Sequence, residues 1–187
     1  QDPGITDQHG RSFNYLRIAV NEKCNLRCIY CMPEKGISFE PHDKLLTSKE
    51  VIRVIQVVAK LGVNKIRFTG GEPLLRKDLV ELVSGSAETP GIDSINLTTN
   101  GVLLANAVEA LKDAGLSGVN VSIDTLEKEK YTEITRRDYI DKACIGLEAA
   151  KGVGISSIKV NVVALRGFND HELSSFGDNL IFNSFCF

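Results

Sequence analysis

The stretch "TSKEVIRVIQVVAKLGVNKIRFTGGEP", residues 47–73, predicts a helix, a strand and a turn in direct succession. The helix is expected at 47–62, because its apolar side chains recur with the helical period and share one face: Val51, Ile52, Ile55, Val58 and Ala59. Thr47 or Ser48 can cap its start, and Gly62 can end it. The strand is "NKIRFT" at 64–69, and the "GGEP" that follows it is a turn sequence.

The alternation of strand and helix continues in both directions from this stretch. Further strands are expected at 15–20, 93–101, 118–124 and 157–167, and further helices at 76–86, 103–115 and 139–152. Such alternation predicts right-handed crossovers and a parallel sheet, which is an α/β fold. Because the strands are rich in Val and Ile, we expect both faces of the sheet to be covered. A (β/α) barrel-like wheel and an open doubly wound sheet both fit, and both place functional residues at the carboxyl ends of the strands.

Polarity divides the chain into three parts. Residues 1–14 are polar and are expected to form a loosely tied N-terminal arm. Residues 15–170 carry the strand–helix pattern and are expected to form one domain. Residues 171–187 do not continue the pattern and are treated as a divergent C-terminal tail.

Composition narrows the classes of protein to consider. The 187 residues carry a formal net charge of −2, so no broad basic field indicates a nucleic-acid partner. No apolar run approaches the roughly 20 residues that span a bilayer, so no membrane association is expected. The five cysteines are odd in number and unevenly spaced, which argues against a secreted disulfide framework and for a reducing compartment.

Three of the five cysteines lie within eight positions, in "NEKCNLRCIYCMP" at residues 21–33. Their spacing is C-x3-C-x2-C, with Cys24, Cys28 and Cys31. A structural zinc ion takes four ligands, and His42 could supply the fourth, although that spacing matches no common zinc pattern. Three thiolates can instead hold three irons of a 4Fe-4S cluster and leave the fourth iron open. Ordinary loop cysteines are the remaining reading of this stretch.

The cysteine motif, with Tyr30 before its last cysteine, and the "TGGEP" turn together resemble the radical S-adenosylmethionine (SAM) superfamily. Within it, five stretches are similar to the MoaA-type GTP 3′,8-cyclase family of molybdenum cofactor biosynthesis: "YLRIAVNEKCNLRCIYCMP", "KIRFTGGEPLLRKDL", "TTNG", "GVNVSIDTL" and "IKVNVVALRGFND". The resemblance covers about residues 10–172. It implies an incomplete (β/α) radical SAM barrel with parallel strands and outer helices.

The resemblance also implies a set of cofactor sites. Cys24, Cys28 and Cys31 would be the ligands of one 4Fe-4S cluster. SAM would bind at the open iron, where reduction cleaves it to methionine and a 5′-deoxyadenosyl radical. The positions that match the family's SAM contacts are Tyr30, Gly71 and Ser122. Asp124 is instead expected to cap the segment that follows it.

GTP is the substrate that the resemblance implies. The positions that match GTP contacts in the family are Arg17, Arg67, Thr98 and Lys159. Arginine and lysine suit this task, since their charges can pair with phosphate oxygens. No P-loop sequence is present, so a P-loop GTPase is not expected. The resemblance implies that a lyase rearranges GTP to 3′,8-cyclo-7,8-dihydroguanosine triphosphate. The basic "RRD" at 136–138 is expected to be a solvated loop.

The family further implies an electron donor, a homodimer, and a location in the bacterial cytoplasm or the mitochondrial matrix. Its members are longer than this chain: they continue through a further strand to a C-terminal region with three more cysteines and a second 4Fe-4S cluster. We therefore expect a C-terminally truncated chain that binds one cluster, lacks the second, and converts GTP poorly. Another radical SAM enzyme, or a metal-binding module that kept the fold without the reaction, remain as alternatives.

Overall fold

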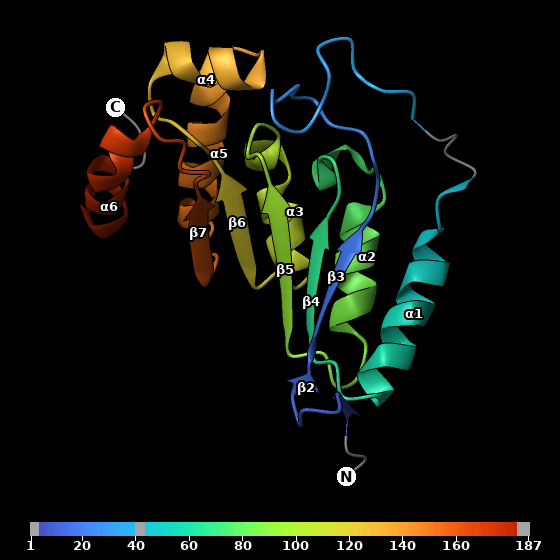
Figure 1. The fold of residues 1–187 in the computed structure, drawn as a ribbon. Helices are drawn as coiled ribbons and strands as arrows, with labels where there is room; N and C mark the ends of the chain where they lie inside the picture. The colour runs from blue at the N-terminus through green and yellow to red at the C-terminus, as the bar shows by residue number, and fades with distance from the viewer. Residues whose placement is uncertain (1–3, 40–43, 183–187) are drawn as a thin grey trace.

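The computed structural model describes residues 4–39 and 44–182. Its centre is a parallel sheet in the order β3-β4-β5-β6-β7, in which each strand pairs with its predecessor along the chain (Figure 1). The strands are β3 (Tyr15–Ala19), β4 (Lys65–Thr69), β5 (Ser94–Thr99), β6 (Gly118–Ser122) and β7 (Ser157–Asn161). The expectation of an α/β fold with parallel strands and outer helices is confirmed.

Four helices in the body of the chain follow the predicted alternation. They are α1 (Ser48–Lys60), α2 (Leu79–Ala87), α3 (Val108–Asp113) and α5 (Ile140–Gly152). Thr47 caps α1 in a capping box with Glu50, so the start of this helix is encoded in four adjacent residues. Among the described residues, no helix is long and apolar enough to cross a membrane.

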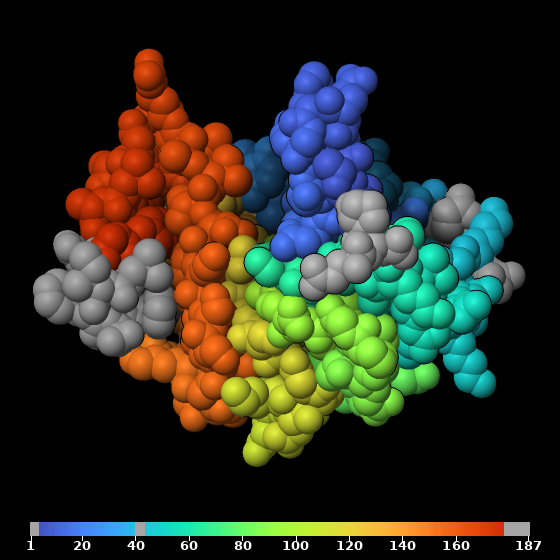
Figure 2. Space-filling view, turned by 90° about the horizontal axis from the view of Figure 1, so that it is seen from below, coloured from blue at the N-terminus to red at the C-terminus, as the bar shows by residue number. Residues whose placement is uncertain are grey.

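One face of the sheet packs on the helices, and the other is polar. Ile66, Phe68 and Leu97 are fully buried on the helix side, where α2, α3 and α5 lie (Figure 1). The alternate side chains, such as those of Arg67 and Asn96, point to the opposite face and are only partly buried. The expectation that both faces are covered is therefore wrong for the part of the chain that the structure describes. We call the polar face the inner face, and Figure 2 shows the molecule hollowed between the N-terminal residues and the β7 region.

Two predicted elements are shorter than expected. The helix predicted at 103–115 is interrupted, because the 3-10 turn η3 (Leu104–Asn106) precedes α3. This turn packs closely on α5 at Gly146, where a Cβ atom would lie 3.1 Å from Cβ of Leu104. The strand predicted at 157–167 ends at Asn161, because the Leu165 amide donates a hydrogen bond to the Asn169 side chain instead of to a neighbouring strand.

Several elements were not predicted. The arm contains a small hairpin of β1 (Ile5–Thr6) and β2 (Ser12–Phe13). Helix α4 (Lys128–Thr135) has a mostly polar sequence, and its few apolar residues do not form a clear helical stripe, so the sequence pattern does not predict it. A 3-10 turn, η2 (Pro73–Leu75), lies between β4 and α2. After β7 the chain continues through a further 3-10 turn, η4 (Asp170–Glu172), into α6 (Leu173–Phe182).

Arg76 and Asp78 join the starts of α1 and α2 to the end of β3. The Arg76 guanidinium donates to Asp78 from Nε (2.8 Å) and from Nη2 (3.0 Å), and the Ser48 hydroxyl also donates to this carboxylate. Arg76 further donates to the carbonyls of Val20 (3.0 Å) and Leu46 (2.9 Å). The hydrogen bonds to its carboxylate lower the pKa of Asp78 to about 2, and the bond from the Arg76 side chain has the largest effect.

This pairing should make stability depend on pH in acid. Because the folded pKa of about 2 lies below the ordinary 3.8, the ionised Asp78 stabilises the fold above about pH 4, and its contribution is lost as the pH falls toward 2. Asp78→Asn should therefore lower the free energy of unfolding at pH 7, and the difference from wild type should shrink between pH 4 and pH 2. Urea denaturation measures this, with Glu81→Gln on an exposed residue as the control. A difference that stays constant over this range would contradict it.

Candidate functional site

The cysteine loop, residues 20–39, follows β3 and lies at the carboxyl end of the sheet (Figure 1). Its three thiols are free; those of Cys24 and Cys28 are half-buried, and Cys31 is exposed. A turn brings the last two together, since the amides of Cys31 (3.1 Å) and Met32 (3.0 Å) both donate to the Cys28 carbonyl. The strand therefore delivers all three cysteines to one loop at the edge where parallel α/β folds place their sites.

The thiols of this loop affect one another electrostatically. Burial raises the pKa of Cys24, and burial together with the neighbouring Cys31 and Cys24 raises the pKa of Cys28 to about 12. The thiolate forms of Cys24 and Cys28 therefore need a compensating cation.

The number of thiols bears on the kind of metal centre. A structural zinc ion takes four ligands, whereas three thiolates on one loop can hold three irons of a 4Fe-4S cluster and leave the fourth iron open. His42, the possible fourth zinc ligand, lies outside the described residues.

The "TGGE" turn after β4 packs directly on the start of the cysteine loop. A Cβ atom on Gly70 would lie 2.4 Å from the Asn21 carbonyl oxygen, and one on Gly71 would lie 2.4 Å from that of Lys23. The Gly71 amide donates to Asn21 (2.9 Å) and the Glu72 amide to Lys23 (2.7 Å). The paired glycines therefore permit close approach between two segments of the chain itself. The role of Gly71 as a SAM contact stays a prediction.

Glu72 is a central residue of this end of the sheet that the sequence did not single out. Its side chain is fully buried and accepts hydrogen bonds from the Thr99 hydroxyl (2.7 Å), the Asn100 amide (2.8 Å) and the Leu74 amide (3.0 Å). The Asn100 side chain in turn donates to Asn25 in the cysteine loop (2.7 Å). Burial raises the pKa of Glu72, and the three donors oppose that rise. One carboxylate thus ties the ends of β4 and β5 together beneath the cysteine loop.

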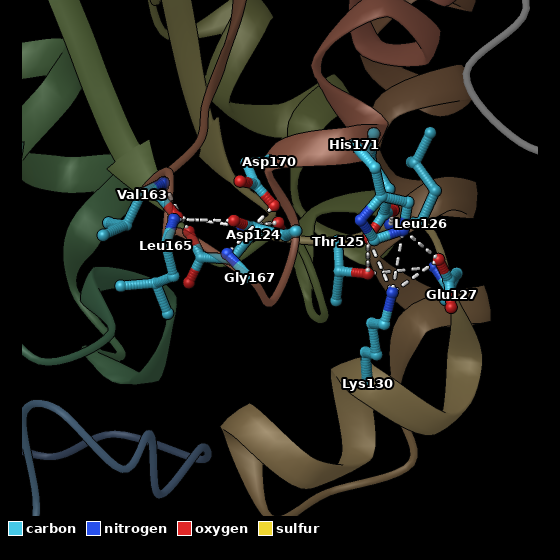
Figure 3. Close-up of polar contacts among 12 residues, drawn as sticks. Asp124, Thr125, Leu126, Glu127, Lys130, Val163, Leu165, Gly167, Asp170 and His171 are labelled. Carbon is cyan, nitrogen blue, oxygen red and sulfur yellow. Dashed lines mark hydrogen bonds and ion pairs between the residues drawn. The ribbon is translucent and has the colours of Figure 1, made fainter.

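Tyr30 reaches from the cysteine loop to the end of β6. Its hydroxyl donates to Asp124 Oδ2 at 2.5 Å, and the Val163 amide donates to Asp124 Oδ1 at 2.9 Å (Figure 3 shows the second contact). Burial and the neighbouring Asp124 raise the pKa of Tyr30. The expectation that Asp124 caps the following segment is wrong, because both of its oxygens bind residues distant in sequence. The ring of Tyr30 is half-exposed, which leaves a face for a ligand.

The segment after β7 closes on the loop after β6. The Asn169 side chain donates to the carbonyls of Asp124 (2.6 Å) and Val163 (2.9 Å). The buried Glu172 accepts from the Thr125 hydroxyl (2.7 Å) and the Leu126 amide (2.8 Å). Nearby, exposed His171 contacts Glu127 and Lys130, each at 2.9 Å (Figure 3). These contacts integrate residues 169–172 into the folded body, while the proposed domain boundary at 170 stays a prediction.

The four residues predicted to contact GTP all lie on the inner face of the sheet. Arg17 and Arg67 are partners in the parallel register, and Arg67 Nη1 lies 3.4 Å from the Thr98 hydroxyl. Thr98 is in register with Asn120, and Asn120 with Lys159. Ser122 lies two residues beyond Asn120 and points to the same face.

The inner face carries cations that have no acidic partner among the described residues. In the described part of the chain, no ion pair involves Arg17, Arg67 or Lys159. The buried Nε of Arg67 also has no hydrogen-bond partner there, and its guanidinium carbon lies 5.8 Å from the Tyr15 ring centroid. A buried donor without a partner is costly, so this face fits an anionic ligand.

Other inner-face residues were missed by the sequence analysis. Asn96, Asn120 and Asn161 lie on β5, β6 and β7 at positions that alternate with apolar residues, which are buried in β5 and β6 and partly buried in β7. The signal was present, since "INLTT", "VNVS" and "IKVN" each alternate apolar with polar residues. Such alternation is typical of a sheet with one polar face.

Comparisons with known proteins agree with this arrangement. GTP 3′,8-cyclase of Listeria monocytogenes serotype 4b is 46% identical over 172 residues, which are 92% of this chain and 52% of that protein. GTP 3′,8-cyclase of Pelotomaculum thermopropionicum is 50% identical over 169 residues, covering 90% of this chain and 52% of that protein. The molybdenum cofactor biosynthesis protein moc-5 of Caenorhabditis elegans is 45% identical, covering 93% of this chain and 29% of that protein. The chain thus spans about half the length, or less, of these curated relatives.

Solved structures share the fold at low sequence identity. SuiB of Streptococcus suis, bound to S-adenosylmethionine, has a TM-score of 0.74 at 21% identity and covers 91% of this chain and 36% of that chain. The native anSMEcpe structure with bound AdoMet has a TM-score of 0.71 at 18% identity, covering 90% of this chain and 48% of that chain. The model of the Radical SAM superfamily matches residues 18–178, which include the cysteine loop and all five strands of the parallel sheet but for the first residues of β3. The chain therefore belongs to the Radical SAM superfamily.

Proposed function

We propose that this chain carries the radical-generating part of a GTP 3′,8-cyclase, a lyase of molybdenum cofactor biosynthesis. One observation supports this most directly: three free thiols lie on one loop at the carboxyl end of a sheet, and the cations on the inner face of that sheet have no acidic partner within residues 4–39 and 44–182. The first feature suits a cluster and the second suits a triphosphate. The similarity to relatives named GTP 3′,8-cyclase supports the same reaction.

Cys24, Cys28 and Cys31 would hold one 4Fe-4S cluster, and Tyr30, Gly71 and Ser122 would contact SAM. When bound, the cluster and SAM supply a 5′-deoxyadenosyl radical, which is chemistry that side chains cannot perform. The chain's own residues orient these groups: Glu72 and the glycine turn fix the start of the loop, and Asp124 holds Tyr30. The exposed half of the Tyr30 ring would offer a flat surface to the adenine.

Arg17, Arg67, Thr98 and Lys159 would bind GTP on the inner face. The charges of Arg17, Arg67 and Lys159 would offset those of the phosphates, and the free Nε of Arg67 would gain an acceptor. Orientation of GTP on this face would bring its ribose toward the carboxyl end of the sheet, where SAM would bind.

The remaining expectations complete this proposal. An electron donor would reduce the cluster, and the protein would act as a homodimer in the bacterial cytoplasm or the mitochondrial matrix. The second 4Fe-4S cluster of the family would need cysteines beyond the trio of residues 24–31. We therefore expect this chain by itself to cleave SAM but to convert GTP poorly.

Anaerobic reconstitution with iron, sulfide and SAM tests the proposal. We expect about four irons per chain and release of 5′-deoxyadenosine when dithionite is added. Arg67→Ala combined with Lys159→Ala should weaken GTP binding at least about tenfold, because two charge-assisted contacts are lost. Calorimetric titration with GTP measures this, and Lys49→Ala, on an exposed helical residue, is the matched control.

The outcomes separate the possible functions. About one zinc ion per chain, with no 5′-deoxyadenosine, would identify a metal-binding module and contradict the radical chemistry. Iron and SAM cleavage without any affinity for GTP would indicate another radical SAM enzyme.

A further inference from the structure

The end of α4 forms the floor on which the cysteine loop rests. The Arg27 amide donates to the Thr135 carbonyl (3.0 Å), and the Ile29 amide donates to the Ile134 carbonyl (2.9 Å). The last carbonyls of a helix have no partner within the helix, so they are free to accept from another segment. The two donor amides belong to the residues on either side of Cys28, so the two hydrogen bonds hold this cysteine in place against the end of α4.

Arg136, the residue after α4, adds a second connection to the same loop. Its Nη1 donates to the carbonyl of Arg27 (2.8 Å) and to that of Met32 (3.1 Å). These carbonyls immediately precede Cys28 and immediately follow Cys31. One nitrogen atom therefore bridges the two ends of the turn that carries two of the three thiols. The expectation of a solvated loop at 136–138 is wrong for Arg136, whose guanidinium is directed into the cysteine loop and is not free in solvent.

The backbone at Arg136 is unusual. Its φ of 55° and ψ of 28° place it in the left-handed region, and it is the single non-glycine residue with positive φ among residues 4–39 and 44–182. Glycine is the usual residue where a helix ends in this conformation, and arginine is disfavoured there. Because arginine disfavours this backbone conformation, its presence at this position indicates that the side chain has a structural or functional role.

We propose that Arg136 is a positioning residue, which clamps the Cys28–Cys31 turn onto the end of α4 and so sets the geometry of the cluster ligands. The inference rests on the proposed function in so far as the cysteines hold a cluster. The planar guanidinium suits this role, since its donors keep a fixed direction toward two carbonyls. Removing a group that orients metal ligands typically weakens metal binding by about 10- to 100-fold.

Arg136→Gly separates the side chain from the backbone. Glycine adopts the left-handed conformation without strain, so the midpoint of thermal unfolding of this variant should be equal to that of the wild type or higher. The reconstituted variant should nevertheless lose iron to a chelator about 10- to 100-fold faster, and the EPR spectrum of its reduced cluster should change. Arg136→Lys should lie between the two, because an ammonium group can still bind one carbonyl. Arg137→Ala, beside it on an exposed residue, should behave as wild type.

A second measurement needs no metal. In the metal-free chain, the Cys28 thiol should react with iodoacetamide about 5- to 30-fold faster in Arg136→Gly than in the wild type, because the turn has lost two hydrogen bonds. Peptide mass spectrometry gives this rate. If the wild type binds no cluster while the rate still rises, the proposed function fails and the clamp stands. Wild-type alkylation and iron release in Arg136→Gly would overturn the clamp itself.

Discussion

A Cys28→Ser chain is expected to retain less than about a tenth of the wild-type iron after anaerobic reconstitution, and to release no 5′-deoxyadenosine. The physical reason is the loss of one of three thiolate ligands, since a hydroxyl oxygen is a poor ligand for an iron–sulfur cluster. Burial, together with the neighbouring Cys31 and Cys24, raises the pKa of Cys28 to about 12, so this thiolate needs a cation beside it. Iron and sulfide analysis, with chromatography of the SAM products, measures both effects.

The control for this change is Ile29→Ala. Ile29 is adjacent in the same turn and 49% exposed, and its amide can still donate to the Ile134 carbonyl. It should retain the cluster. Serine at Cys24 or at Cys31 should reproduce the loss seen at Cys28. Wild-type iron content in all three variants would show that the trio is not the cluster site.

The second large effect is expected from Glu72→Ala. This change leaves three buried donors without their acceptor: the Thr99 hydroxyl, the Asn100 amide and the Leu74 amide. Each unsatisfied buried donor costs about 1–3 kcal/mol, so the free energy of unfolding should fall by at least about 3 kcal/mol. Cluster retention should fall as well, since Asn100 also contacts Asn25 in the cysteine loop. Denaturant unfolding of the metal-free chain gives the first quantity, and iron analysis gives the second.

Two comparisons sharpen the test of Glu72. Glu72→Gln keeps the shape of the side chain and one acceptor oxygen, but its NH2 group must face one of the three donors. We therefore expect a loss of stability that is smaller than with alanine. Glu81→Ala removes an exposed carboxylate on α2 and should change the free energy of unfolding by less than about 0.5 kcal/mol. Equal stability in Glu72→Ala and Glu81→Ala would show that the buried carboxylate is not a structural centre.

The parts of the fold that the sequence predicted well are those encoded locally. Helix α1 was expected at 47–62 and is observed at Ser48–Lys60, since its capping box and apolar stripe lie within one short stretch. The strands were recognised in the same way, from runs of β-branched residues between turn signals. The helix expected at 103–115 was wrong in detail, because contact with α5 at Gly146 imposes a 3-10 turn there. Local pattern does not report on such contacts between elements.

In the candidate site, too, the features encoded by neighbouring residues were predicted, and those that depend on distant residues were not. The spacing of Cys24, Cys28 and Cys31 is a local property, so the sequence identified the superfamily and predicted that this loop binds a metal cluster. The supports of that loop depend on distant residues: Arg136 binds a carbonyl 109 positions away, and Tyr30 binds Asp124 across 94 positions. A glutamate, an aspartate or an arginine in a polar stretch gives no sign by itself of which distant group it will meet.

The sequence by itself thus determined the order of strands and helices, the cysteine trio and the identity of the cations on the strands, since each is carried by neighbouring residues. Only the tertiary structure decided that the sheet has an uncovered polar face, that Glu72 lies at the centre of a buried hydrogen-bond network, and that Arg136 is directed into the cysteine loop. The reason is physical: burial and hydrogen bonding are set by which segments pack together, and packing joins segments that the sequence keeps far apart.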